Sequence, residues 1–231
     1  MIQSLILNLA TTLVPLILAI AVHEWAHVAA ARWLGDRTGE EQGRLTLNPL
    51  AHIDPIWTVG LPAFLVISST LGGAAAAVIP FFAAGKPAPY NPVRFSRQVG
   101  GKRVTMRTGE LLVAAAGPAS NIVLAIVTTV LLLILVKSGA SLADPRSIAQ
   151  LVFGFILLNV GLAAFNLLPV PPLDGSKVLM SLLPRPAAAK YEAVASQLSW
   201  LLLLLLVFGG ARFVLGPIQR AAIELVLRVV A

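Results

Sequence analysis

The strongest constraint in this sequence is an uncharged apolar stretch that leads straight into a pair of histidines. Leu5 to Val22 carries no charge, and the chain continues as His23-Glu24-Trp25-Ala26-His27. A helix over Leu5 to Leu34 is long enough to cross a hydrocarbon core of about 30 Å. It would hold His23 roughly 14 Å below the first basic residue, Arg32, since an α-helix rises about 1.5 Å per residue. Polar side chains at that depth are costly and usually functional.

Two histidines four residues apart lie on one face of a helix and can bind one metal ion together. Imidazole is a preferred ligand of zinc, and the intervening Glu24 lies beside the two rings, where it can take a proton from zinc-bound water. The spacing therefore predicts hydrolytic chemistry, with His23 and His27 as ligands of one Zn²⁺ per chain and Glu24 as the base.

The composition indicates the class of protein. Of the 231 residues, 58% are hydrophobic and 12% are charged, whereas soluble domains carry about twice that share of charge. We therefore expect an integral, multi-pass membrane protein that forms a single domain over residues 1–231 in the lipid bilayer. The sequence contains no cysteine, which excludes disulfides and thiolate chemistry. The net charge of +7 is attributed to a cytoplasmic loop between Gly85 and Glu110, which is rich in basic residues, and not to nucleic-acid binding.

Five apolar segments are expected to cross or re-enter the membrane, namely Leu5–Leu34, Ile56–Ala84, Glu110–Val136, Leu151–Leu168 and Ser199–Leu215. A last segment, Ile218–Val230, places Arg220, Glu224 and Arg228 four residues apart, which predicts a helix at the membrane interface after a break at Gly216-Pro217. The fold class is thus an all-α integral membrane protein with about five to six transmembrane or re-entrant segments. A short β or re-entrant element near the site and a C-terminal interfacial helix complete it.

A zinc site of this kind needs a third protein ligand. The extended motif with a third histidine is excluded, because Ala30 and Trp33 occupy its positions. Acidic residues of the first polar loop remain candidates, namely Asp36, Glu40, Glu41 and Asp54. Asp174 is favoured, because it follows an apolar run in a stretch where three prolines forbid a regular helix and Gly175 permits a sharp turn. Irregular backbone at membrane depth is tolerated where it lines a cavity.

Three motifs, in this order, resemble the site-2 protease family of zinc intramembrane proteases. They are HEWAH from His23, AGPASN from Ala116 and NLLPVPPLDG from Asn166. The stretches Gly43–Pro55 and Gly85–Pro92 are similar to a compact bacterial and archaeal branch of that family. No inserted PDZ-like or nucleotide-sensing CBS domain is visible. We expect a catalytic core over about residues 1–183, followed by a C-terminal span and helix over about residues 190–231.

The resemblance implies specific roles. His23, His27 and Asp174 would bind zinc, and Glu24 would activate the zinc-bound water. Asn166 would donate a hydrogen bond to the substrate carbonyl or its oxyanion, a task that suits a side-chain amide. A buried asparagine that only satisfies neighbouring backbone is the alternative for this residue.

Other polar or small residues near these motifs have simpler interpretations. Gly117, Pro118 and Asn121 are interpreted as packing and backbone devices, since small residues let spans approach closely. His52 lies between Asn48-Pro49 and Asp54-Pro55, which favours a loop or gate role over metal binding.

Topology poses a further requirement. The family ends the HExxH span on the cytoplasmic side, and the basic loop after Gly85 predicts the same side. The segment Ile56–Ala84 must therefore return to the side it left, and Gly72-Gly73 could divide it into a hairpin. The family also implies an exposed strand that pairs with the substrate. We expect that strand between Gly43 and Leu47 or around Ala84–Pro89.

The leading function is that of a zinc metalloendopeptidase that hydrolyses a peptide bond in or near a transmembrane segment of a membrane protein or peptide substrate. A prokaryotic cell membrane is expected, with the active site opening to the cytoplasmic side. The alternative is a non-proteolytic membrane metal-binding scaffold or chaperone of the same fold. A transporter gains little support, because no internal repeat is apparent. Glu24 favours the protease, since only hydrolysis needs a base beside the ligands.

Overall fold

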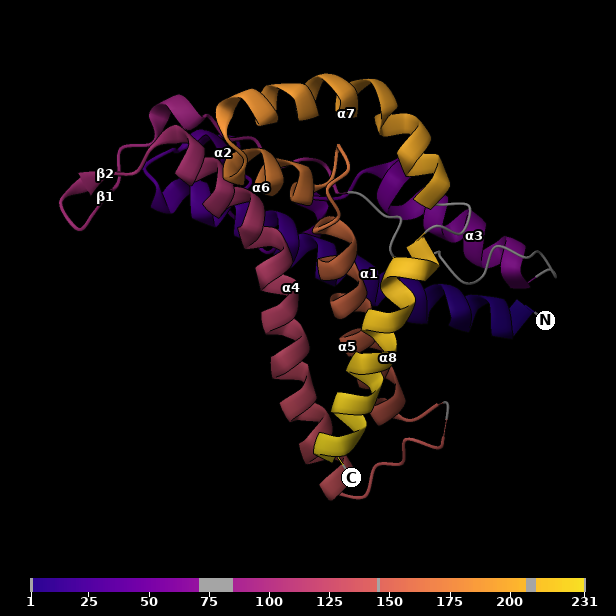
Figure 1. The fold of residues 1–231 in the computed structure, drawn as a ribbon. Helices are drawn as coiled ribbons and strands as arrows, with labels where there is room; N and C mark the ends of the chain where they lie inside the picture. The colour runs from indigo at the N-terminus through magenta and orange to yellow at the C-terminus, as the bar shows by residue number, and fades with distance from the viewer. Residues whose placement is uncertain (1, 71–84, 145, 207–210, 231) are drawn as a thin grey trace.

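The computed structural model describes residues 2–70, 85–144, 146–206 and 211–230, and these are mostly helical (Figure 1). In chain order the elements are α1 (Ile2–Trp33), α2 (Thr38–Glu41), α3 (Leu61–Thr70), β1 (Gln98–Val99), β2 (Lys102–Arg103), α4 (Met106–Lys137), α5 (Ile148–Asn166), α6 (Asp174–Leu182), α7 (Arg185–Leu205) and α8 (Ala211–Val230).

Three helices among the described residues are long and apolar enough to cross a membrane, and they are α1, α4 and α5. They confirm the helices expected over the first, third and fourth apolar segments. Capping side chains explain where two of these helices begin. Before α4, the Thr105 side chain accepts a hydrogen bond from the Thr108 amide, and before α5 the Ser147 side chain accepts one from the Gln150 amide. The chain is thus an all-α membrane protein.

Helix α4 packs against both α1 and α5, and α8 runs beside α5 (Figure 1). One buried apolar cluster joins α1, α5, α8 and the residue before α6, and its members are Leu16, Ala19, Ile20, Leu158, Leu162, Phe165, Leu173 and Leu215. A second joins α4, α5 and α8 through Ala125, Leu132, Ala149, Ile156, Val226 and Val230. The first cluster lies against the end of α5 and the start of α6, which also border the predicted metal site.

The segment expected over Ile56–Ala84 is described only in its first half. Asp54 accepts hydrogen bonds from the amides of Ile56 and Trp57, and a wide helical turn over Pro55–Gly60 continues into α3. The rest of the segment, with the Gly72-Gly73 hairpin proposed there, lies outside the described residues.

Among the described residues, no strand is found at either expected place, and Ala84 of the second place lies outside them. The backbone is irregular over Gly43–Leu47 and from Gly85 to Pro89, and within the described residues the two short strands form an antiparallel hairpin further on, with Gln98 opposite Arg103. Two glycines with positive φ, Gly100 and Gly101, make its turn.

The C-terminal part differs from the expectation in two respects. The described part of the span expected over Ser199–Leu215 belongs to two helices, α7, which already begins at Arg185, and α8, which begins at Ala211, while residues 207–210 lie outside the described residues. The expected break at Gly216-Pro217 is also absent, since both residues lie inside α8. The apolar side of α8 is buried against α4 and α5. The polar residues predicted four apart on it, Arg220, Glu224 and Arg228, are exposed. Burial against neighbouring helices outweighs the local cost of a proline here.

Candidate metal centre

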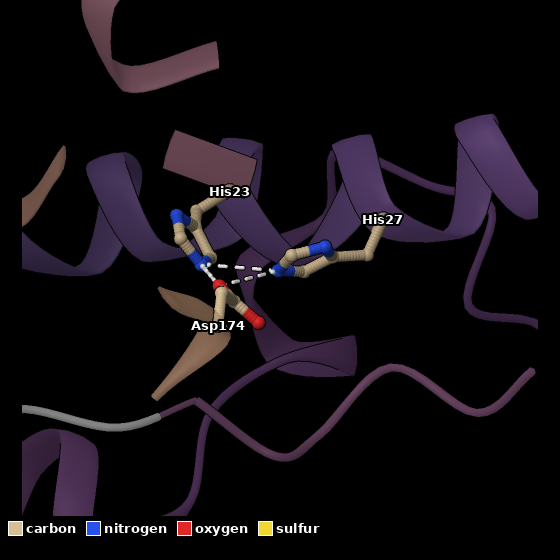
Figure 2. A group of neighbouring side chains, drawn as sticks. All are labelled: His23, His27 and Asp174. Atoms are coloured by element: carbon tan, nitrogen blue, oxygen red, sulfur yellow. Dashed lines mark hydrogen bonds and ion pairs between the residues drawn. The ribbon is translucent and has the colours of Figure 1, made fainter. Parts of the chain in front are cut away.

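The two histidines of α1 and the carboxylate at the start of α6 meet in one buried cluster (Figure 2). His23 Nε2 lies 3.1 Å from Asp174 Oδ2, and His27 Nε2 lies 3.2 Å from the same oxygen. The two Nε2 atoms are 3.1 Å apart. All three residues are only 6–8% exposed. The structure thus brings together the three residues predicted as ligands, although Asp174 follows His23 by 151 positions.

The outer nitrogens of the two rings fix where the protons lie. His23 Nδ1 donates to Asn121 Oδ1 at 2.6 Å, and His27 Nδ1 donates to the carbonyl oxygen of Val113 at 2.7 Å. Because these oxygens only accept, both Nε2 atoms of the neutral imidazoles carry lone pairs. Three acceptors, including Asp174 Oδ2, then face one another at 3.1–3.2 Å with no proton between them. A cation at their centre would turn this repulsion into attraction.

The donor set and its dimensions fit zinc. Two imidazole nitrogens and one carboxylate oxygen form a known ligand set of catalytic zinc sites, in which the fourth position is left for water. Tetrahedral bonds of about 2.0–2.1 Å would separate neighbouring ligand atoms by about 3.3 Å. The separations of 3.1–3.2 Å in the cluster are close to that value.

A buried pair of amides stands behind His23. Asn121 was expected to serve packing, yet its Oδ1 accepts from His23 and its Nδ2 donates to Asn159 Oδ1 at 2.9 Å. Asn159 in turn donates to the carbonyl oxygen of Phe155, and both asparagines are fully buried. The contacts orient the His23 ring, as the outer partners of metal-binding histidines do. Asn159 was not predicted from the sequence, although an asparagine inside an apolar span is a signal of function.

Helix α4 passes the two imidazoles at Gly117. A Cβ atom at this position would lie 2.5 Å from His27 Cε1 and 2.6 Å from His23 Nε2, which is closer than atoms can approach. Only glycine lets α4 run this close to the rings, in agreement with the packing role expected for Gly117.

Asp174 reaches the histidines because α6 begins at this residue, directly after the proline-rich turn. A Cβ atom on the next residue, Gly175, would overlap the backbone of Leu167 at the end of α5, so glycine allows the close approach. Binding of a metal ion requires the Asp174 carboxylate in its ionised form.

The four other acidic candidates for the third ligand make contacts of their own, and they are Asp36, Glu40, Glu41 and Asp54. The two glutamates pair with Arg32 and Arg94 at 2.7 and 3.0 Å. The two aspartates accept hydrogen bonds from backbone amides. None of the four belongs to the described cluster that could hold a metal ion.

A cavity of about 470 Å³ opens beside the cluster, and its wall includes the three clustered residues, Glu24 and Asn166. Glu24 is 9% exposed. Gly85 lies directly against it, since a Cβ atom there would come within 2.8 Å of Glu24 Cγ. The carboxylate expected to act as the base therefore borders the same cavity as the clustered ligands.

The segment that covers Glu24 is tied to the first polar loop. The Lys86 amide donates to the His52 carbonyl oxygen at 2.8 Å, and the Arg44 guanidinium donates to the carbonyl oxygens of Lys86 and Pro87. Arg44 is 6% exposed and His52 is 1% exposed. The His52 ring donates to the backbone of Thr46 at 2.7 Å, which agrees with the loop role expected for it.

Asn166 is the last residue of α5 and lines the cavity. Its Nδ2 donates to the carbonyl oxygen of Leu162 at 3.0 Å, one helical turn earlier. This bond matches the alternative in which the amide serves the backbone, while the position on the cavity wall matches a contact with substrate. The amide group has a second N–H, so the two roles are compatible.

Comparison with known proteins gives consistent matches. The family model described as "Peptidase family M50" matches residues 134–206. The Bacillus subtilis protein named "Putative zinc metalloprotease YwhC" is 33% identical over 217 residues, which are 93% of this chain and 88% of that one. The Mycolicibacterium smegmatis protein named "Putative zinc metalloprotease Rip2" is 31% identical over 196 residues, which are 84% of this chain and 65% of that protein.

A shorter match reaches an archaeal protein. The Methanocaldococcus jannaschii protein named "Putative zinc metalloprotease MJ0611" is 46% identical over 67 residues, which are 29% of this chain and 31% of that one. No solved structure matches the chain. The YwhC match covers nearly the whole of both chains, so this chain belongs to the M50 family of zinc metalloproteases.

Proposed function

We propose that this protein is a zinc-dependent endopeptidase that hydrolyses a peptide bond in or near a transmembrane segment of a membrane protein. The observation that carries the proposal is the convergence of three buried acceptors, His23 Nε2, His27 Nε2 and Asp174 Oδ2, at 3.1–3.2 Å from one another. Glu24 on the wall of the same cavity supports hydrolysis, because a scaffold or a transporter needs the ligands but no base.

We assign different roles in the reaction to different residues of the site. His23, His27 and Asp174 would hold one zinc ion, which would supply Lewis acidity to the scissile carbonyl and to a water molecule. Glu24 takes the proton from the attacking water and delivers it to the leaving amine nitrogen. Asn166 donates its second amide hydrogen to the carbonyl oxygen on which negative charge develops.

The surroundings of the site support a membrane-embedded substrate. The cavity wall carries large apolar side chains beside the polar cluster, among them Ile20, Leu162, Phe165, Trp57 and Trp200. Three of the helices that build it, α1, α4 and α5, are long and apolar enough to cross a membrane. The backbone of the substrate must be extended where it is cleaved. We propose that this part of the substrate lies along Gly85 to Pro89, where the chain borders Glu24.

We place the protein in a prokaryotic cell membrane with the site opening to the cytoplasm. The bacterial and archaeal sources of its relatives support the first part. The basic residues between Gly85 and Glu110 support the second, since cytoplasmic loops carry an excess of lysine and arginine.

The test is a Glu24→Gln variant, purified in detergent and compared with wild type on a panel of transmembrane peptides. We expect the variant to keep its zinc and to lose cleavage by a factor of about 100 or more, because general-base catalysis contributes that much. Glu192→Gln, an exposed position on α7, is the matched control and should cleave as wild type does. Unchanged cleavage by Glu24→Gln would reject Glu24 as the base, and no cleavage by zinc-loaded wild type would favour the scaffold instead.

A further inference from the structure

Lys177 places a positive charge on the wall of the cavity. It lies on α6, three residues after Asp174, so the two side chains leave the helix on neighbouring positions. Among the described residues that line the cavity, Lys177 is the one lysine or arginine. The proposed zinc chemistry gives this ammonium group no task.

No carboxylate lies within ion-pair distance of Lys177 in the described part of the chain. The neighbouring carboxylate of Asp174 is turned toward the two histidines. Asp54, which also lines the cavity, accepts hydrogen bonds from two backbone amides after it. The ammonium group therefore borders the substrate cavity without an anionic partner.

Tyr90 holds the ammonium group at this wall. Lys177 Nζ lies 5.6 Å from the centre of the Tyr90 ring, a cation–π distance. The ring itself is stacked on Phe95, with the ring centres 6.4 Å apart and the planes within 9° of parallel. The next residue is anchored too, because the Asn91 amide donates to Asp36 at 2.6 Å. Lys177 is thus presented to the cavity by a fixed aromatic platform.

We infer that Lys177 binds a carboxylate of the substrate, so that the enzyme prefers an acidic group at one position near the cleaved bond. The inference rests on the proposed function and names the substrate class of that site. A carboxylate is the one fixed anion that an unmodified peptide offers, either on an aspartate or glutamate side chain or at a free C-terminus. In a cavity with many apolar walls water screens such a pair only weakly, which strengthens the attraction.

The experiment compares kcat/KM of purified, zinc-loaded wild type on transmembrane peptides that differ by one group. The first pair carries Glu or Gln at each position near the cleaved bond, with amidated C-termini. The second pair carries no acidic residue and has a free or an amidated C-terminus. We expect a preference of about tenfold for the carboxylate in one of the two pairs, mainly through KM, as a charge-assisted hydrogen bond would give.

Variants of Lys177 test whether this residue causes the preference for a carboxylate. In Lys177→Gln the ratio of the two peptides should fall to about one, and Lys177→Glu should prefer a lysine at the same position. Lys190→Gln is the matched control, because Lys190 is exposed on α7 outside the cavity wall, and it should keep the wild-type preference.

Three results would overturn the inference. They are equal cleavage of all paired peptides by wild type, a carboxylate preference that survives in Lys177→Gln, and a fall of kcat in Lys177→Gln that is the same for every peptide. Peptide binding by the Glu24→Gln protein separates this question from catalysis. Carboxylate-selective binding without cleavage by wild type would uphold the role of Lys177 and reject the protease. Binding without any selectivity would reject the role of Lys177 itself.

Discussion

Gly117 is a residue at which the site tolerates little change. In Gly117→Ala the new methyl group would meet both imidazoles of the cluster, at 2.5 Å from His27 Cε1 and 2.6 Å from His23 Nε2. The rings or the helix must move, and a displacement of about 1 Å can cost about 100-fold in rate. We therefore expect weaker zinc binding in a chelator competition and a fall of about 100-fold in kcat/KM.

Gly154→Ala is the matched control for this substitution. Gly154 also lies inside a long apolar helix, α5, but a Cβ atom there would meet nothing within 4 Å among the described residues. Zinc affinity and kcat/KM should stay at the wild-type values. Wild-type zinc binding by Gly117→Ala would show that α4 does not approach the rings as closely as described.

Asn121→Leu tests the orientation of the first ligand. Leucine fills a similar volume but accepts no hydrogen bond, so the Nδ1–H of His23 would lose its partner in a buried site. The proton could then move to the nitrogen that faces Asp174. Loss of such a partner typically weakens metal binding about 10- to 100-fold, and we expect a change of that size in zinc affinity.

The control is Ser120→Ala, one position earlier on α4. The Ser120 hydroxyl donates to the carbonyl oxygen of Gly117 within its own helix and contacts neither ring in the described structure. Its removal should leave zinc affinity unchanged. If Asn121→Leu bound zinc within twofold of wild type, the asparagine would be a packing residue only, as the sequence first indicated.

At this scale the sequence predicted what lies within one helical turn. His23, Glu24 and His27 were predicted as site residues from their spacing, and Asp174 was predicted from irregular backbone together with a family resemblance. Asn159 could not be identified as a partner of the site, because its role depends on the contact between α4 and α5 and not on any local pattern.

Among the elements, the irregular segment after Gly85 depends on Arg44. Its guanidinium donates to the carbonyl oxygens of Lys86 and Pro87, and the Lys86 amide is held by the carbonyl oxygen of His52 at 2.8 Å. Arg44→Met removes the charged donor, which is worth roughly 1.5–3 kcal/mol for bonds of this kind. We expect hydrogen exchange of the Lys86 amide to become at least about tenfold faster, with a fall in kcat/KM.

Arg37→Met provides the comparison within the same loop. Its side chain is 63% exposed and lies 3.6 Å from Glu40, so its loss removes the same charge from the surface without touching the segment. Exchange at Lys86 should remain at the wild-type rate. Equal exchange in both variants would mean that Arg44 does not hold this segment in place.

The spans that α1, α4 and α5 form were predicted because a long uncharged run has few alternatives to a membrane helix. The C-terminal elements were predicted less well. A proline at position 217 indicated a break, yet Leu215 and Val226 are buried on either side of it within one helix. Such tertiary burial has no local signature, since the buried partners come from α1, α4 and α5.

The excess positive charge of the molecule comes from basic residues that also make specific contacts within the fold. The basic residues between Gly85 and Glu110 were interpreted as a topology signal, but several also hold the chain together. Arg94 pairs with a glutamate, while Arg103 and Arg107 donate to backbone carbonyl oxygens at 2.6 and 2.7 Å. An excess of positive charge can therefore mark the cytoplasmic side and stabilise the fold at once.

The central claim concerns the molecule as a whole, because the proposed zinc site exists only when α6 brings its first residue to α1. The most direct measurement is the zinc content of purified wild type, Glu24→Gln and Asp174→Ala, prepared in parallel without added chelator. We predict one zinc ion per chain in wild type and in Glu24→Gln, and almost none in Asp174→Ala, because two histidines alone leave the site without its carboxylate. A full complement of zinc in Asp174→Ala, or none in wild type, would contradict the account.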